Sequence, residues 1–175
     1  MRIATFVTTV TLAALGTIAF AQSVTYDFDR SADFSKLRTY AWVRGTALRD
    51  ELNHQRIERA IDAQLTMKGL AKVETADRPD LHVAYHATFD RDLQISGFSS
   101  RWGPYRFGGS FSGSARAEEI LVGTLVVDVM DAKTSTIVWR GIASKDIDVK
   151  ASPEKREKSI TKTAEKLFKN YPPKQ

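Results

Sequence analysis

The residues best suited to contact a partner lie in one stretch rich in glycine and serine, residues 96–114. Trp, Tyr and Arg dominate the binding hot spots of protein interfaces, and a long segment without periodicity in a compact domain is usually functional or disordered. The sequence therefore predicts a partner-binding segment over residues 97–113. Its candidate contact residues are Arg101, Trp102, Tyr105, Arg106 and Phe107. The alternatives are that these rings pack back onto a sheet edge or that the segment is disordered.

The histidines are the candidate metal ligands of the sequence. His82 and His86 have the spacing of a metal-binding pair on a helix. The alternating pattern around them predicts a strand instead, where the two rings share a face but stand about 13 Å apart. Because zinc binds imidazole nitrogens at ~2.0–2.1 Å, one ion cannot take both rings from a straight strand. We expect His54 on the exposed part of a helix, so no metal site is predicted.

The aspartates and serines are the remaining candidates for a catalytic role. Asp128 and Asp131 are interpreted as structural, with Asp131 opening a turn. The serines between Gly109 and Gly113 lack the spacing and the strand-to-helix context of a nucleophile elbow. No glycine loop precedes a helix in the manner of a phosphate site. The sequence thus supplies no catalytic residue and no cofactor site, and it favours a non-enzymatic protein.

The N-terminus predicts export. Residues 1–21 combine Arg2, an uncharged apolar run and the small-x-small site Ala19–Ala21, which is the layout of a secretory signal peptide cleaved after Ala21. The alternative is an uncleaved anchor, since the apolar run approaches the ~20 residues that span a bilayer. The chain of 175 residues has a net charge of +5 and no cysteine, which excludes disulfides and a lipidated cysteine. Export makes nucleic acid an unsuitable partner.

Hydrophobic periodicity defines the elements that must position these residues. Alternation predicts strands and helical spacing predicts amphipathic helices. The strands are expected over residues 24–28, 39–43, 80–90, 119–130 and 136–149, and the helices over 50–68 and from 152 to about 170. Gly69 is expected to end the first helix, and Ser152 and Pro153 to begin the second. Both helices must bury an apolar stripe, which favours an α+β two-layer sandwich. We expect an antiparallel or mixed sheet of about five strands with both helices on one face, in a single domain over residues 22–175.

Several short motifs together resemble a known family. They are Tyr26–Asp29, Thr39–Trp42, Leu65–Leu70, Pro79–His86, Gly123–Asp128, Val138–Gly141 and the terminal Tyr171–Pro173. Their order and spacing resemble the bacterial envelope family called domain of unknown function 4136, many of whose members are lipoprotein-like. The resemblance covers essentially the whole chain after residue 21. It implies a small periplasmic or outer-membrane-associated α+β domain and no particular activity.

Three functional hypotheses follow. The first is a non-enzymatic periplasmic protein that binds an envelope protein or a cell-wall component through residues 97–113 and the neighbouring sheet edge. The second is a small-ligand binder or an unrecognised hydrolase, with His82, His86 or Asp128 in a helix–sheet cleft. The third is a purely structural protein. The basic face of the last helix is interpreted as solvated.

Overall fold

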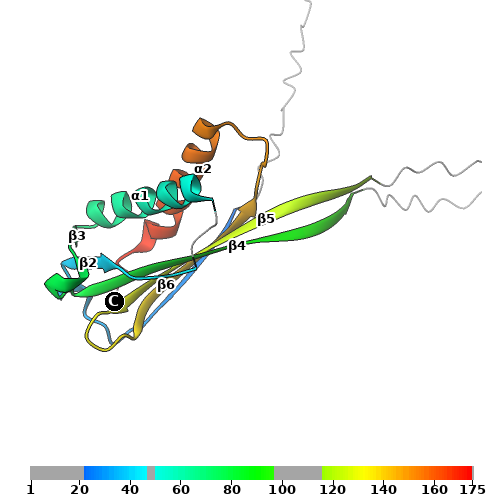
Figure 1. Ribbon diagram of the computed structural model, residues 1–175. Helices are drawn as coiled ribbons and strands as arrows, with labels where there is room; N and C mark the ends of the chain where they lie inside the picture. Colours follow the sequence, from blue (N-terminus) through cyan, green and yellow to red (C-terminus); the bar gives the residue numbers. More distant parts are fainter. Residues whose placement is uncertain (1–21, 47–49, 97–115, 175) are drawn as a thin grey trace, which may run out of the picture.

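Six strands form one mixed sheet, and two helices cover one of its faces (Figure 1). The computed structural model describes residues 22–46, 50–96 and 116–174. The strands are β1 (Ser23–Phe28), β2 (Thr39–Trp42), β3 (Ala71–Lys72), β4 (Leu81–Ser96), β5 (Arg116–Asp131) and β6 (Ile137–Asp146). The helices are α1 (Glu51–Met67) and α2 (Pro153–Leu167), with 3-10 turns η1 (Phe34–Lys36), η2 (Thr75–Asp77) and η3 (Phe168–Asn170).

The sheet confirms the predicted α+β two-layer class. Its strand order is β1-β6-β5-β4-β2-β3. β2 runs parallel to β3 and β4, whereas the β1–β6, β6–β5 and β5–β4 pairs are antiparallel. The sixth strand, β3, has two residues, so it is too short for an alternating pattern to reveal it. β4 also extends to Ser96, beyond the end expected at residue 90.

Local interactions of the chain set both ends of α1. The Asp50 carboxylate accepts a hydrogen bond from the Asn53 backbone N–H at 3.1 Å, which caps the helix start. At the other end Gly69 has φ +86°, a conformation that glycine adopts without steric cost. The Leu70 N–H then donates to the Leu65 carbonyl at 3.0 Å, closing a Schellman motif. The turn directs Leu70 back into the core, where it is 5% exposed.

The second helix is also capped as the sequence predicts. The Ser152 hydroxyl accepts from the Lys155 N–H at 3.4 Å, and Pro153 occupies the first turn. Ala164, Leu167 and Phe168 are buried, each at most 1% exposed. A Cβ on Gly141 would stand 2.8 Å from Leu167 and would clash with the Trp139 ring. The missing side chain at Gly141 therefore lets the end of α2 approach β6 closely.

The core lies between the helices and the near face of the sheet. Trp139 stacks on Phe168 with ring centroids 5.1 Å apart, and Tyr171 meets Trp139 edge-on at 5.3 Å. Ile61 and Leu65 of α1 are fully buried in the same cluster. Within residues 22–46, 50–96 and 116–174, no helix is long and apolar enough to cross a bilayer. The predicted signal peptide, residues 1–21, lies outside the described residues.

Candidate functional site

The far ends of β4 and β5 form a two-stranded ribbon that extends away from the helices (Figure 1). This ribbon consists of residues 88–96 of β4 and their partners 116–124 of β5. The last contact on the outer edge of β4 in the described chain is the Ala87 N–H, which donates to the Thr46 carbonyl at 3.3 Å. On the other edge, β6 pairs with β5 from Val122 onward, and the Ile147 N–H reaches the Leu121 carbonyl at 2.7 Å. Within the described chain, residues 92–96 and 116–120 therefore pair only with each other.

Burial along β4 falls as the strand leaves the helices. Leu81 and Val83 are fully buried and Tyr85 is 3% exposed, whereas Phe89 on the same face is 48% exposed. A two-stranded ribbon is marginally stable by itself in water, and unpaired strand edges are templates for pairing with another chain. The ribbon is thus a projection that the core does not require. It combines exposed apolar surface with unpaired backbone groups.

The predicted contact residues belong to the segment that joins the two strands of the ribbon in sequence. Arg101, Trp102, Tyr105, Arg106 and Phe107 fall between Ser96 and Arg116 and lie outside the described residues. The structure does show the strand ends that this segment connects. The strand ends on either side of them, Ser96 and Arg116, are direct partners in the β4–β5 register.

A second polar group lies on the sheet face opposite the helices. Arg140 of β6 donates to both carboxylate oxygens of Asp128 in β5, at 2.6 and 2.7 Å. The His86 Nε2 lies 3.6 Å from Asp128, and the Thr46 backbone N–H donates to the His86 Nδ1 at 3.1 Å. Asp128 is 4% exposed, and the bidentate guanidinium contact supplies hydrogen bonds to both of its carboxylate oxygens. The bond to Asp128 in turn raises the pKa of Arg140.

This arrangement changes the second functional hypothesis. His82, His86 and Asp128 alternate with the buried residues of their strands, so all three face away from the helices. They do not line a helix–sheet cleft, because the helices cover the other face. His82 and His86 share a face, as predicted, and His86 meets Asp128 only diagonally across the strands. The sequence did not indicate that Arg140 would join this group.

A groove of about 420 Å³ lies beside the first turns of α1. His54 Nδ1 is hydrogen-bonded to the Tyr85 hydroxyl, and its Nε2 lies 3.6 Å from Glu58. Trp42 meets the Tyr85 ring edge-on, with centroids 6.2 Å apart. The expectation that His54 is exposed is therefore wrong: its side chain is 23% exposed and packs on Tyr85. The four-residue spacing of His54 and Glu58 in the sequence is the pattern that could have indicated their contact on one helix face.

Asp62 organises the next turn of α1. It accepts hydrogen bonds from the Tyr40 hydroxyl at 2.7 Å and the Trp42 indole N–H at 2.8 Å. Lys72 of β3 completes the group with an ion pair at 3.0 Å. Burial, followed by the bond to Asp62, raises the pKa of Tyr40. These partners of the Asp62 carboxylate belong to β2 and β3. The cluster therefore holds α1 against the β2–β3 edge of the sheet.

The remaining acidic residues near the N-terminus serve turns. Asp29 accepts from the Ser31 N–H at 2.8 Å, and Asp33 caps η1 through the Ser35 N–H at 3.1 Å. The bonds from Lys36 and Ser35 lower the pKa of Asp33 to about 2.

Asp131 accepts from the Lys133 and Thr134 N–H groups, which confirms its predicted turn. Over the residues that the structure describes, no three His, Asp or Glu side chains gather as a metal site would require.

Solved structures share this fold at low identity. A PDZ domain protein from Parabacteroides distasonis has a TM-score of 0.59 and 18% identity, over 88% of this chain and 37% of that protein. The present chain thus spans well under half of that relative. PelC from Paraburkholderia phytofirmans, solved as a dodecamer, has a TM-score of 0.53 and 9% identity over 89% of this chain and 100% of PelC.

A third solved structure carries the family name. It is a DUF4136 family protein from Bacteroides thetaiotaomicron, with a TM-score of 0.52 and 14% identity over 86% of this chain and 96% of that one. The family described as "Domain of unknown function (DUF4136)" has a sequence model that matches residues 24–173. A comparison with curated protein sequences gives no match.

Proposed function

The chain belongs to the DUF4136 family, and we propose that it is a non-enzymatic, exported envelope protein. In this proposal it binds a protein or cell-wall partner through residues 97–113 and the adjoining edges of the ribbon. The ribbon is the observation that carries the proposal. It extends two long strands past the layer of helices, and within the described chain the outer edges of residues 88–96 and 116–120 are unpaired.

Export rests on the N-terminal sequence. Arg2, the uncharged run that follows it and the Ala19–Ala21 cleavage site form the layout that a signal peptidase recognises. The body of the protein buries an apolar core without any disulfide, so it can fold after transport whatever the redox state of the compartment. Mass spectrometry of the exported protein is expected to show Gln22 as its first residue. An N-terminus that retains Met1 would contradict cleavage.

The mode of binding follows from the two parts of the proposed surface. An incoming extended segment can add to a free strand edge through backbone hydrogen bonds, while side chains supply specificity. Residues 88–96 offer such an edge, with no neighbouring strand there in the described chain. The Trp, Tyr, Phe and Arg residues of 101–107 supply the side-chain types that carry binding energy. Edge pairing and aromatic contacts together would fix both the register and the identity of the partner.

The test places a photo-reactive residue at Trp102 in the full chain expressed in its own envelope. A matched control places the same residue at Met67, an exposed position of α1 that is 68% exposed. After irradiation, one discrete protein or glycan adduct from position 102 and none from position 67 is the expected result. No adduct from position 102 in exported, folded protein would overturn the proposal, as would adducts of the same identity from both positions.

Substitution tests the contact residues directly. Replacing Trp102, Tyr105 and Phe107 together by Ala is expected to abolish recovery of the crosslinked partner from a second probe at Arg106. The matched control is Leu52→Ala, which removes an apolar side chain that is 63% exposed on α1. Circular dichroism establishes that both variants fold. Unchanged recovery from the triple variant would show that the aromatic residues do not make the contact.

A further inference from the structure

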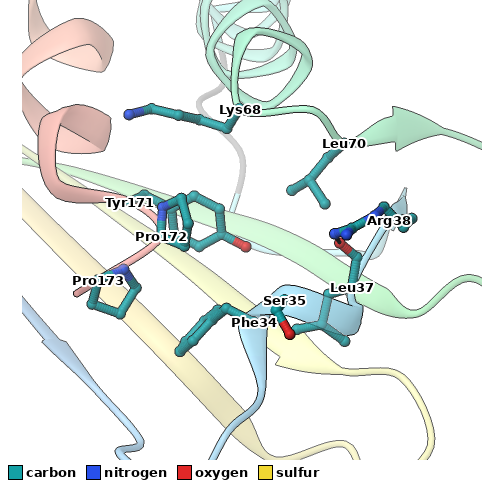
Figure 2. A pocket seen from close by; sticks show the side chains of 9 residues that line it. All are labelled: Phe34, Ser35, Leu37, Arg38, Lys68, Leu70, Tyr171, Pro172 and Pro173. Carbon is teal, nitrogen blue, oxygen red and sulfur yellow. Dashed lines mark hydrogen bonds between the residues drawn. The ribbon is translucent and has the colours of Figure 1, made fainter. Parts of the chain in front are cut away.

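A pocket of about 290 Å³ opens at the end of the sheet where β4 begins, opposite the ribbon (Figure 2). It lies between η1, the turn that ends α1 and the C-terminal tail. Its apolar walls come from Phe34, Leu37, Leu70 and the Tyr171 ring. Phe34, Leu70 and Tyr171 are 8%, 5% and 3% exposed, so the core itself holds these walls in place. The volume lies at the lower end of the ~300–1,000 Å³ typical of small-molecule sites.

The Tyr171 hydroxyl points into this pocket (Figure 2). The ring is held edge-on by Trp139 and Phe34, with centroids 5.3 and 5.9 Å away. Among the described residues the hydroxyl has no hydrogen-bond partner, although Tyr171 is 3% exposed. Burial raises the pKa of Tyr171, so the group is a protonated donor at neutral pH. The hydroxyl oxygen is not among the buried polar atoms without a partner, so it is open to solvent in the pocket and can donate to a ligand oxygen.

The rim of the pocket is positively charged. Arg38 and Lys68 line it together with Ser35, and none of the lining residues is acidic. The Arg38 Nη1 donates to the Leu37 carbonyl at 2.9 Å, which leaves its other N–H groups available. Lys68 makes one long contact, 3.4 Å, to the Lys169 carbonyl. In the described chain neither cation has a carboxylate partner.

Two acidic residues beside η1 and β2 are already engaged elsewhere. Asp33 pairs with Lys36 at 2.8 Å. Asp80 accepts from the backbone N–H groups of Arg38 and Thr39 at 2.9 and 3.0 Å. Both carboxylates serve turns or strand ends and do not line the pocket. The two cations on its rim are therefore free to attract an anion from solution.

We propose that this pocket binds a small amphiphilic carboxylate. The apolar body lies against Phe34, Leu37 and Leu70, and the carboxylate accepts from the Tyr171 hydroxyl and pairs with Arg38. The Lys68 ammonium, which lies at the Lys169 carbonyl, adds positive charge at the rim without contacting the carboxylate directly. A guanidinium fork matches the planar geometry of a carboxylate, and the apolar walls favour a body without polar atoms. The inference is independent of partner binding by the ribbon, because the two surfaces lie at opposite ends of β4.

The test is an NMR titration of the purified protein with octanoate, 1-octanol and acetate. 1-Octanol keeps the apolar body but lacks the charge, and acetate keeps the charge but lacks most of the body. Octanoate is expected to shift the amide signals of residues 34–38, 68–70, 171 and 174 and to bind about tenfold or more tightly than either partial probe. Equal binding of octanoate and 1-octanol would overturn the proposal, and so would shifts confined to other residues.

Three variants examine the polar groups one at a time. Arg38→Gln and Tyr171→Phe are each expected to weaken octanoate binding about tenfold, with Lys68→Gln weaker in effect because its ammonium is a mobile point charge. Tyr171→Phe keeps the ring and hence the core packing. Lys36→Gln is the matched control, since it removes the same charge beside the pocket without lining it. Equal weakening by Arg38→Gln and Lys36→Gln would reduce the effect to general charge and contradict the site.

Discussion

The two ends of β4 carry the same alternating pattern into two different environments. At the first end Leu81 and Val83 lie beneath the helices and are fully buried, while β2 and β5 flank the strand. At the other end Phe89 continues the same face yet is 48% exposed, and residues 92–96 have β5 as their one partner in the described chain. Alternation therefore predicts a strand and its two faces. Burial depends on what the rest of the chain brings to that face.

The comparison distinguishes the body of the protein, which provides the stability of the fold, from the ribbon, which extends beyond it. The body contains the buried aromatic cluster, the helix caps and the closely packed Gly141 position. The ribbon contains backbone pairing and partly exposed apolar side chains, which stabilise little by themselves. A fold that only needed stability would not require the ribbon. This contrast supports the assignment of partner binding to the ribbon end and can be tested by unequal responses of the two regions.

The largest difference is expected from truncating one apolar side chain in each region. Leu81→Ala should lower the free energy of unfolding by about 2–5 kcal/mol, because it opens a cavity in a fully buried site. Phe89→Ala should cost about 1 kcal/mol or less, since nearly half of that side chain already contacts solvent. Urea unfolding followed by circular dichroism measures both. Equal costs would show that the ribbon is as tightly packed as the body.

Hydrogen exchange should separate the same two regions residue by residue. Amides of β4 between Leu81 and Tyr85 are expected to exchange through global unfolding, whereas those beyond Asp90 exchange through local opening. The expected difference in opening free energy is about 2 kcal/mol or more, roughly thirtyfold in rate. NMR or mass spectrometry can record it. Uniform protection along the strand would place the ribbon in the same cooperative unit as the core.

A smaller effect is expected from the polar link at the body end of β4. Asp80 accepts from the Arg38 and Thr39 N–H groups and from the Thr39 hydroxyl, at 2.9 to 3.0 Å. Asp80→Asn should cost about 1–2 kcal/mol, because an amide replaces a charged acceptor. Asp80→Ala is the harsher comparison, since it removes both acceptors and leaves the N–H groups unpaired. A cost within error for both variants would show that this link is dispensable.

The same link predicts a dependence on pH. The bonds from the Arg38 and Thr39 N–H groups lower the pKa of Asp80 below its ordinary value. The folded protein therefore binds fewer protons at Asp80 than the unfolded chain does near pH 4. The stabilisation is present above about pH 4 and is lost as the pH falls through the folded pKa. Unfolding free energies measured from pH 6 to pH 2 should fall less steeply in Asp80→Asn than in the parent protein.

The smallest effect on stability is expected from removing most of the ribbon. Asp90 and Val122 are direct partners across β4 and β5, so a two-residue Asn-Gly turn can join them in place of residues 91–121. The free energy of unfolding should change by about 1 kcal/mol or less, while partner crosslinking is lost. A large drop in stability would show that the removed segment packs on the body. That result would return the aromatic residues to a structural role.

The sequence predicts the regular parts of this protein well because their causes are local. Capping at Ser152, the stop at Gly69 and the turn at Asp131 depend on a few neighbouring residues, and each is confirmed. The α+β class also followed, since two amphipathic helices need one sheet face. The sequence did not reveal β3, because a pair of residues cannot show a period. The sequence also did not reveal the far end of β4, where no third strand or helix of the described chain imposes a buried face.

The candidate sites divide along the same line. Residue types alone indicated Arg101, Trp102, Tyr105, Arg106 and Phe107 as partner contacts, and these remain a proposal. The environment of His54 was misjudged, because its contact with Tyr85 joins residues far apart in the chain. The pocket around Tyr171 was not anticipated, since it needs η1, the end of α1 and the C-terminal tail together.

The sequence by itself determined where the helices begin and end, which strand faces are apolar, and that both helices share one face of a sheet. These features follow from backbone hydrogen bonding and hydrophobic periodicity, which act over a few residues. Only the tertiary structure decided that Arg140 pairs with Asp128, that β4 leaves the core at Phe89, and that the Tyr171 hydroxyl faces a cationic rim. Such contacts join distant segments, so they depend on strand order and packing rather than on local spacing.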